Sequence, residues 1–284
     1  MKILITGIKG QVGHALMHEL TEYKLIGLTR QDCDLTNLDQ IKQVIDQHQP
    51  DLIINPAAYT KVDQAEEEPE LAFKINRDAP KVMAEMAREY NIPFIHFSTD
   101  YVFDGEKNET YEENDPTHPL GVYGQSKCAG EEAIQEVGGQ IYIFRTSWVY
   151  SNIGHNFYLT MKKLSQDRDE LKVVADQIGV PTSNQFIAEQ IKLIIPQLHE
   201  NNTGIYHLVP NESSSWYDFA KQIIGQTNPR FNLEYLHAIQ TYEFPTKTKR
   251  PANSVLSNVK IKEIFNLNFS DWQSCLSQVI VEEK

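Results

Sequence analysis

The sequence is poor in cysteine and lacks the common motifs for a catalytic metal or a serine nucleophile. Three cysteines occur, Cys33, Cys128 and Cys275, and no two of them form a CxxC pair. An odd number of scattered thiols favours reduced packing residues over disulfides or a zinc site. Neither an HExxH nor a GxSxG segment is present, so the sequence indicates neither a catalytic metal nor a serine hydrolase.

Positive charge and long apolar runs are also scarce. The chain has 26 lysines and arginines against 39 acidic residues, a formal net charge of -13, and no basic block. We therefore expect no nucleic-acid partner, because duplex phosphates require a positive surface, and we interpret the acidic surface as solvation. The opening run MKILITG is too short for a signal segment or a membrane span and is typical of a buried strand. We expect a cytoplasmic protein without a membrane partner.

Apolar, β-branched runs alternate with segments of helical periodicity along much of the chain. This alternation is typical of a parallel sheet covered by helices on both faces, so we predict an α/β fold of the doubly wound Rossmann type. We assign residues 1–150 to the main domain and residues 151–284 mainly to a smaller α/β lobe. A strand and helix around 171–198 are expected to return to the main sheet, which makes the lobe discontinuous. The strand-like runs are KILIT, KLIGLT, DLIINPAA, PFIHFST, QIYIFRTSWV and LKVVAD.

A glycine-rich loop follows the first predicted strand directly. In GIKGQVG, Gly7, Gly10 and Gly13 have the spacing GxxGxxG, with Gln11 and Val12 before the last glycine and an apolar helix behind. Glycines allow a tight turn and let backbone amides approach a pyrophosphate at the positive end of a helix. The spacing differs from the common GxGxxG, and three glycines could serve only the turn. We favour dinucleotide binding because of the strand-loop-helix context.

The end of the second predicted strand bears on the choice of dinucleotide. Where an acidic residue would bind the ribose diol of NAD, the chain has Thr29 and Arg30. An arginine here can bind a 2'-phosphate, so we predict NADPH as cofactor with NADH as an accepted alternative. Asp34 and Leu35 could contact the adenine. A solvated arginine and a turn-forming aspartate would explain the same residues.

Tyr123 and Lys127 lie four residues apart, where a loop is predicted to become a helix. This spacing puts them on one helical face, and we expect the ammonium to lower the pKa of the phenol. The strand PFIHFST brings Thr99, followed by Asp100, to its carboxyl end, where doubly wound sheets bind ligands. Alternatively, the tyrosine packs at the helix start and the lysine is solvated.

Six segments in order carry a more specific pattern: TGIKGQVG, NPAAYTKVDQAE, IHFSTDYVFDG, PLGVYGQSKCAGE, RTSWVY and DQIGVPTS. Together they resemble the extended short-chain dehydrogenase/reductase superfamily, and within it the dTDP-4-dehydrorhamnose reductase family. The resemblance spans essentially the whole chain, including the terminal RPANSVLSNVKI.

The resemblance implies roles for the central residues. Tyr123 would protonate a C4 carbonyl oxygen while the nicotinamide delivers hydride, Lys127 would bind the nicotinamide ribose, and Thr99 would hydrogen-bond the carbonyl. Asn76 matches the asparagine that stabilises the active-site geometry in this superfamily, although a surface asparagine would look identical. Residues next to the cofactor would include Ala57, Ala58 and Tyr59.

The resemblance also suggests residues on the substrate side. In related 4,6-dehydratases an acidic residue follows the aspartate that matches Asp100, whereas this chain has Tyr101, so elimination lacks one of its two groups. Arg250 is a plausible partner for a diphosphate, because its planar donors can engage two oxygens. The other expected substrate contacts, each of which could instead be structural, are Trp148, Gln177, Pro181 and Thr182.

The function implied is reduction of the C4 ketone of dTDP-4-dehydro-L-rhamnose to dTDP-L-rhamnose. Two alternatives stay open: a ketoreductase for another nucleotide sugar, and a noncatalytic regulatory subunit of the same superfamily. Family members can carry Mg²⁺ at a subunit contact, but we map no matching carboxylate set. We expect a monomer or a homodimer.

Overall fold

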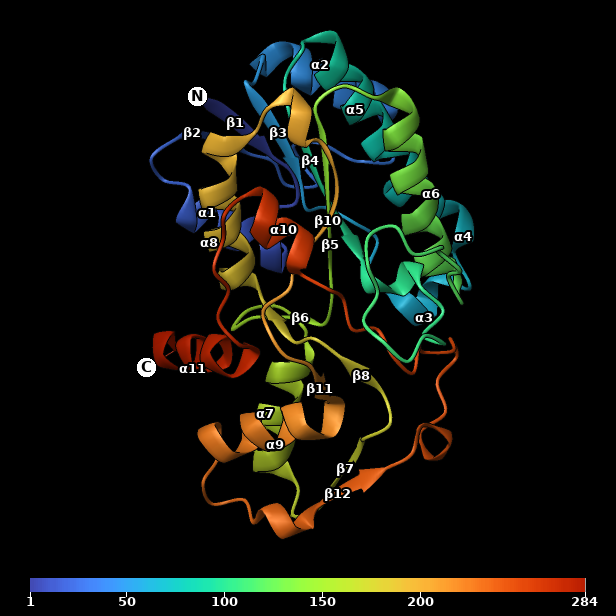
Figure 1. Cartoon of the computed structure of the whole chain (residues 1–284), viewed down its shortest axis with the longest axis vertical. Helices are drawn as coiled ribbons and strands as arrows, with labels where there is room; N and C mark the ends of the chain where they lie inside the picture. The colour runs from blue at the N-terminus through green and yellow to red at the C-terminus, as the bar shows by residue number, and fades with distance from the viewer. Residues whose placement is uncertain (284) are drawn as a thin grey trace.

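A six-stranded parallel sheet forms the centre of the larger part of the molecule (Figure 1). The computed structural model describes residues 1–283. The strands are β1 Lys2–Ile5, β2 Lys24–Gly27, β3 Leu52–Asn55, β4 Phe94–Thr99, β5 Ile141–Thr146 and β10 Gly204–His207. Their order is β10-β5-β4-β3-β1-β2, and each neighbouring pair is parallel. The predicted fold class is confirmed.

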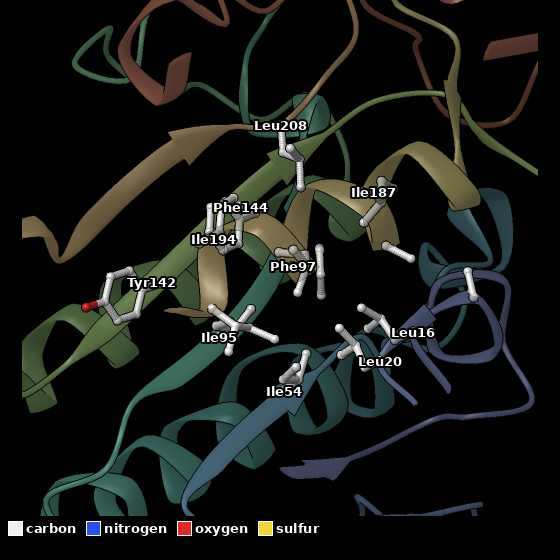
Figure 2. Close-up of a cluster of buried hydrophobic side chains, with 14 of the residues drawn as sticks. Leu16, Leu20, Ile54, Ile95, Phe97, Tyr142, Phe144, Ile187, Ile194 and Leu208 are labelled. Carbon is white, nitrogen blue, oxygen red and sulfur yellow. The ribbon is translucent and has the colours of Figure 1, made fainter. Parts of the chain in front are cut away.

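Helices cover both faces of this sheet, because alternate strand residues point to opposite sides. On one face lie α1 (Gln11–Glu19), α8 (Asn184–Ile194) and α10 (Val259–Ile264), and on the other lie α2 (Leu38–His48), α5 (Ala79–Glu89) and α6 (Val122–Val137). Strand β1 illustrates the alternation: Ile3 and Ile5 pack on the first face and Leu4 on the second. Figure 2 shows the first cluster, in which side chains such as Ile54, Ile95 and Phe97 of the sheet lie close to Leu16, Leu20 and Ile187.

The expectation of a strand returning to the main sheet near residue 171 is wrong. Strand β7 (Leu171–Val174) pairs in parallel with β12 (Leu236–Ile239) in a separate two-stranded sheet. One of its residues, Lys172, is exposed, which a central strand covered on both faces would not allow. The helix of the same prediction, α8, does pack on the main sheet, next to α1. The sixth strand of that sheet is β10, which the sequence pattern did not reveal.

The C-terminal half also builds a second, smaller core below the sheet (Figure 1). Its helices are α7 (Phe157–Asp167), α9 (Trp216–Thr227) and α11 (Trp272–Glu282). Two short strand pairs link it to the sheet region: β6 (Val149–Tyr150) with β9 (Thr182–Ser183), and β8 (Ile178–Gly179) with β11 (Ser214–Ser215). Helix α8 packs on the large sheet and β10 is one of its strands, although both follow α7 and β7 of the smaller core in the sequence. Any division of the chain into two domains is therefore discontinuous. A boundary at residue 150 stays a prediction.

Two further findings bear on the expectations from composition. Cys33, Cys128 and Cys275 are free and buried, as predicted for packing residues. None of the helices formed by residues 1–283 is long and apolar enough to cross a membrane.

Candidate active site

The glycine loop after β1 is packed so tightly that two of its positions require glycine. Gly7 has φ +59°, and a Cβ there would lie 2.8 Å from Cβ of Ala57. A Cβ on Gly13 would lie 2.4 Å from the carbonyl oxygen of Gly7. The loop therefore brings the start of α1 directly against the turn after β1, and any larger residue would push them apart.

The amino terminus of α1 provides backbone donors for an anion. Gly10 is the N-cap and supplies no side-chain hydrogen bond, so the first N–H groups of the helix are left for a ligand at its positive end. The side chain of Gln11 is used structurally, since its Oε1 accepts from Ser151 and Asn156. Val12 packs against the core of the same face. For Gln11 and Val12, therefore, only the backbone N–H groups are placed to bind a phosphate.

A cavity of about 440 Å³ lies beside this loop. It brings together half of the cofactor residues predicted from the sequence, and these follow β1, β2 and β3. The small side chains of Ala57 and Ala58 form part of its wall and keep it open. Its lining includes Gly7, Thr29, Arg30, Asp34, Leu35, Ala57, Ala58 and Tyr59.

Arg30 stands at the rim of this cavity with 78% of its side chain exposed. Its Nε lies 4.0 Å from Oδ2 of Asp34, a contact too long and too exposed to fix the guanidinium. Asp34 also accepts from the backbone N–H and the hydroxyl of Thr36, and the backbone bond lowers the pKa of its carboxyl. The turn-forming interpretation of Asp34 is thus correct, while Arg30 stays free to meet an anion.

At the carboxyl end of β4, the predicted catalytic residues converge. Thr99 is the last residue of β4, and Tyr123 and Lys127 lie in the first two turns of α6. The ring of Tyr101 packs edge-on against that of Tyr123, with 5.8 Å between centroids. The hydroxyl of Thr99 donates to Oδ1 of Asp100 at 3.0 Å. Residues 24 positions apart in sequence therefore share one site.

The expectation that Lys127 lowers the pKa of Tyr123 is wrong for this arrangement. Burial raises the pKa of Tyr123, the charge of Asp100 raises it further, and a hydrogen bond with Thr99 opposes them. The ammonium group of Lys127 points elsewhere: its Nζ lies 2.6 Å from the carbonyl oxygen of Phe97 and 3.0 Å from Nε2 of His96. Burial lowers the pKa of Lys127 to about 8. The phenol therefore stays protonated at neutral pH.

Asn76 is buried and holds two parts of the site together. Its Oδ1 accepts from the backbone N–H of Tyr59 at 2.8 Å, and its Nδ2 donates to the carbonyl oxygen of Tyr59 and to the hydroxyl of Ser126, both at 3.0 Å. It lies in a π-helical turn, Lys74–Asp78, a deviation from α-helix that is frequent at functional sites. The surface alternative for Asn76 is excluded, since 1% of the residue is exposed.

Glu66 and His96 also contact α6, the helix that carries Tyr123 and Lys127, and no pattern in the sequence indicated either residue. Oε1 of Glu66 accepts from the backbone N–H of Val122 at 2.9 Å and so caps the helix that carries Tyr123. In the sequence it begins the acidic run EEE, which looks like solvated surface, and His96 looks like one polar residue within a strand.

A second cavity, of about 950 Å³, is lined in part by Tyr101. Arg250 lies over the ring of Tyr101, 5.8 Å from its centroid, and its Nη2 donates to Oδ2 of Asp63 at 2.8 Å. Gln177 also lines the cavity and donates to the hydroxyl of Thr241. Three predicted substrate residues, Tyr101, Gln177 and Arg250, thus share this wall.

Trp148, Pro181 and Thr182, which were also predicted to contact the substrate, do not line this cavity. The ring of Trp148 stacks on that of Trp216, with 3.5 Å between centroids, and it is Trp216 that lines the cavity. Pro181 is buried, and the fully buried hydroxyl of Thr182 donates to the carbonyl oxygen of Val180. Sequence alone could not distinguish Trp216 from an ordinary core aromatic.

The described part of the chain, residues 1–283, has no group of three or more His, Cys, Asp or Glu side chains placed to hold a metal ion. The site is instead built from hydroxyl groups, one buried amine and backbone donors.

Comparison with known proteins agrees with this geometry. The sequence pattern of the RmlD substrate binding domain matches residues 1–284. A dTDP-4-dehydrorhamnose reductase of Aggregatibacter actinomycetemcomitans is 42% identical over 98% of both chains, and one of Escherichia coli K12 is 38% identical over 99% of this chain and 98% of its own. The structure of a dTDP-4-dehydrorhamnose reductase from Bacillus anthracis in complex with NADP superposes with a TM-score of 0.92, at 36% identity and 99% coverage of both chains. This chain therefore belongs to the RmlD family of dTDP-4-dehydrorhamnose reductases.

Proposed function

We propose that this chain reduces the C4 ketone of dTDP-4-dehydro-L-rhamnose to dTDP-L-rhamnose with NADPH, and that NADH is an accepted alternative. The observation that carries the proposal is the meeting of Thr99, Tyr101 and Tyr123 at the carboxyl ends of the strands. Tyr101 lines a large cavity together with Arg250, and a smaller cavity lies beside the glycine loop. We assign the smaller cavity to the hydride donor and the larger one to the sugar nucleotide.

The residues around the smaller cavity fit a dinucleotide. The N–H groups of Gln11, Val12 and Gly13 in the first turn of α1 suit a pyrophosphate, whereas that of Gly10 donates to the carbonyl oxygen of Gly7 and closes the loop. The exposed guanidinium of Arg30 suits a 2'-phosphate. Ala57, Ala58 and Tyr59 would lie beside its riboses, and Lys127 would bind the ribose next to the nicotinamide. When bound, NADPH supplies the hydride.

The protein supplies the proton. A phenol whose pKa is raised by burial stays protonated at neutral pH, and this is the form that an acid catalyst of carbonyl reduction requires. We assign Tyr123 to donate its proton to the carbonyl oxygen and Thr99 to hydrogen-bond the same oxygen. Asp100 is followed by a tyrosine and not by a second acid, which favours simple reduction over loss of water.

On the substrate side we assign Arg250 to the diphosphate, and Tyr101 and Gln177 to the sugar. Trp148, Pro181 and Thr182 would act through what they support: Trp148 stacks on Trp216, Thr182 begins β9, and Pro181 precedes it. We further propose that the protein acts in the cytoplasm as a monomer or a homodimer, which light scattering of the purified protein distinguishes.

The decisive experiment measures oxidation of NADPH by the purified protein with a panel of dTDP- and UDP-linked 4-keto sugars. We expect turnover to be fastest with dTDP-4-dehydro-L-rhamnose and the product to be dTDP-L-rhamnose. Tyr123→Phe serves as the matched control: it should bind NADPH normally and lose about 100-fold or more of kcat. Preference for another base or another product would indicate a different nucleotide-sugar ketoreductase. Cofactor binding without turnover of any sugar would indicate a regulatory subunit.

A further inference from the structure

Behind the proposed catalytic residues, four buried polar side chains form a continuous chain of hydrogen bonds. The hydroxyl of Thr6 donates to Oδ1 of Asn55 at 2.5 Å, Nδ2 of Asn55 lies 3.1 Å from Nδ1 of His96, and Nε2 of His96 lies 3.0 Å from Nζ of Lys127. No more than 2% of any of the four is exposed. They come from the ends of β1 and β3, from β4 and from α6, and Asn55 and His96 are direct partners in the β3–β4 register.

Contacts within the protein occupy most of the hydrogen-bonding capacity of Lys127. A lysine ammonium has three N–H donors. One meets the carbonyl oxygen of Phe97, and a second can be given to Nε2 of His96 when that nitrogen carries no proton, so the ammonium keeps one for a ligand. His96 and the carbonyl of Phe97 together fix where that third donor points.

Few charges act on this lysine. Glu131, one turn further along α6, is the acidic group that acts on it, and its carboxylate is already paired with Arg145 of β5 at 2.7 Å. Tyr123 is protonated, and β1 and β3 contribute only the neutral Thr6 and Asn55. The group in direct contact with the amine is therefore the imidazole of His96, which burial and the charge of Lys127 keep neutral by lowering its pKa.

A neutral imidazole in this position can satisfy both charge states of Lys127. With the amide of Asn55 turned as it is here, Nδ2 donates to Nδ1 of His96, the ring proton is on Nε2, and Nε2–H donates to a neutral amine. If the amide turns by half a turn, Oδ1 accepts from Nδ1–H, and Nε2 accepts from an ammonium. From the ammonium arrangement to the amine arrangement, one proton leaves Lys127, to solvent in a titration or to the ligand at its third N–H during catalysis. The ring keeps one proton, which moves from Nδ1 to Nε2. The hydroxyl of Thr6 changes from accepting from Nδ2 of Asn55 to donating to its Oδ1.

We propose that His96 and Asn55 are positioning residues that let the buried Lys127 change its charge during catalysis, because the ring tautomer and the amide orientation change together with it. The proposal goes beyond the reduction itself and rests on it only for the role of Lys127 beside Tyr123. It assigns a purpose to a histidine that no substrate or cofactor contact requires. The pKa of Lys127, about 8, places the change within reach of ordinary assay conditions.

The direct test is the tautomer of His96, measured by ¹⁵N NMR of histidine-labelled protein from about pH 6 to about pH 10. We expect Nδ1–H at low pH and Nε2–H at high pH, with a midpoint near the pKa of Lys127. In Lys127→Met the tautomer should no longer depend on pH. A single tautomer over the whole range in the unsubstituted protein overturns the proposal. The titration needs no sugar, so a pH-dependent tautomer supports the proposal even if no 4-keto sugar is reduced.

The kinetic test uses two substitutions with different expected outcomes. Asn55→Asp supplies an acceptor that fixes Nδ1–H and favours the ammonium, so the basic limb of the kcat profile should move up by about one pH unit or more. His96→Phe removes the partner of the amine and should lower kcat about 10-fold or more, with a smaller change in KM for NADPH, whereas His96→Gln should recover part of the loss. A purely structural role would lower stability and leave the pH profile unchanged, and that result in Asn55→Asp rejects the proposal even if His96→Phe does not fold.

Discussion

The side-chain amide of Asn76 donates to the hydroxyl of Ser126 at 3.0 Å, and that hydroxyl donates to the backbone carbonyl of Tyr123 at 2.8 Å. Asn76 also pairs with both backbone groups of Tyr59. One buried residue therefore connects the cavity beside the glycine loop to the first turn of α6. Replacing Asn76 should therefore disturb the cavity wall at Tyr59 and the start of α6 together.

Asn76→Ala removes three buried hydrogen bonds and leaves their partners unsatisfied. We expect the free energy of unfolding to fall by about 3 kcal/mol and kcat to fall with it, because α6 loses its anchor. Ser126→Ala is the matched control, since it removes the link from Asn76 to Tyr123 through the Ser126 hydroxyl but keeps both bonds to Tyr59. Urea unfolding and steady-state kinetics check both variants, and equal stability of Asn76→Ala and the unsubstituted chain would contradict the anchoring role.

Asp100 should make stability depend on pH. Its side chain is buried, and burial raises its pKa from 3.8 to about 6. Between these values the folded state binds more protons than the unfolded state, so stability should fall as pH rises through this window. Asp100→Asn removes that slope. Relative to the unsubstituted chain it should therefore gain about 2 to 3 kcal/mol between about pH 4 and about pH 7.

The measurement for Asp100→Asn is urea unfolding of both proteins at the two pH values. Comparing the change between the pH values cancels any constant cost of the substitution. Parallel pH dependence in the two proteins would show that the carboxyl titrates normally despite its burial.

Arg30→Ala should separate the two nicotinamide cofactors. The guanidinium makes no close contact that fixes it within the protein, so its removal should leave stability almost unchanged and raise KM for NADPH about tenfold, with little change for NADH. Arg30→Lys keeps the charge, so its KM for NADPH should lie between those of the unsubstituted protein and Arg30→Ala. Equal effects on both cofactors would identify Arg30 as solvated surface.

Arg250 should contribute to substrate binding more than to stability. Its ion pair with Asp63 is partly exposed, with 17% and 44% of the two side chains accessible, and such pairs contribute about 1 kcal/mol or less. Arg250→Ala should therefore raise KM for the sugar nucleotide about tenfold or more while unfolding changes little. Arg250→Lys keeps the charge but cannot engage Asp63 and a diphosphate together, so it should restore binding only in part. An unchanged KM in Arg250→Ala would exclude a diphosphate contact.

Several features of the site follow from short-range sequence alone. The spacing of Gly7 and Gly13 after an apolar strand predicts the tight strand-to-helix turn, and the spacing of four positions from Tyr123 to Lys127 puts both on one side of a helix. Thr99 at the end of a strand falls at the ligand-binding edge of a parallel sheet. These predictions succeed because the geometry of a turn or a helix is set by residues within a few positions of each other.

What the tertiary structure decided is which distant groups meet. Lys127 bonds to His96 and not to Tyr123, Trp216 and not Trp148 lines the larger cavity, and β7 pairs with β12 outside the main sheet. In each case several partners of suitable chemistry exist along the chain, and no local pattern selects among them. The choice depends on burial and packing of elements dozens of residues apart, which the sequence specifies only through the complete fold.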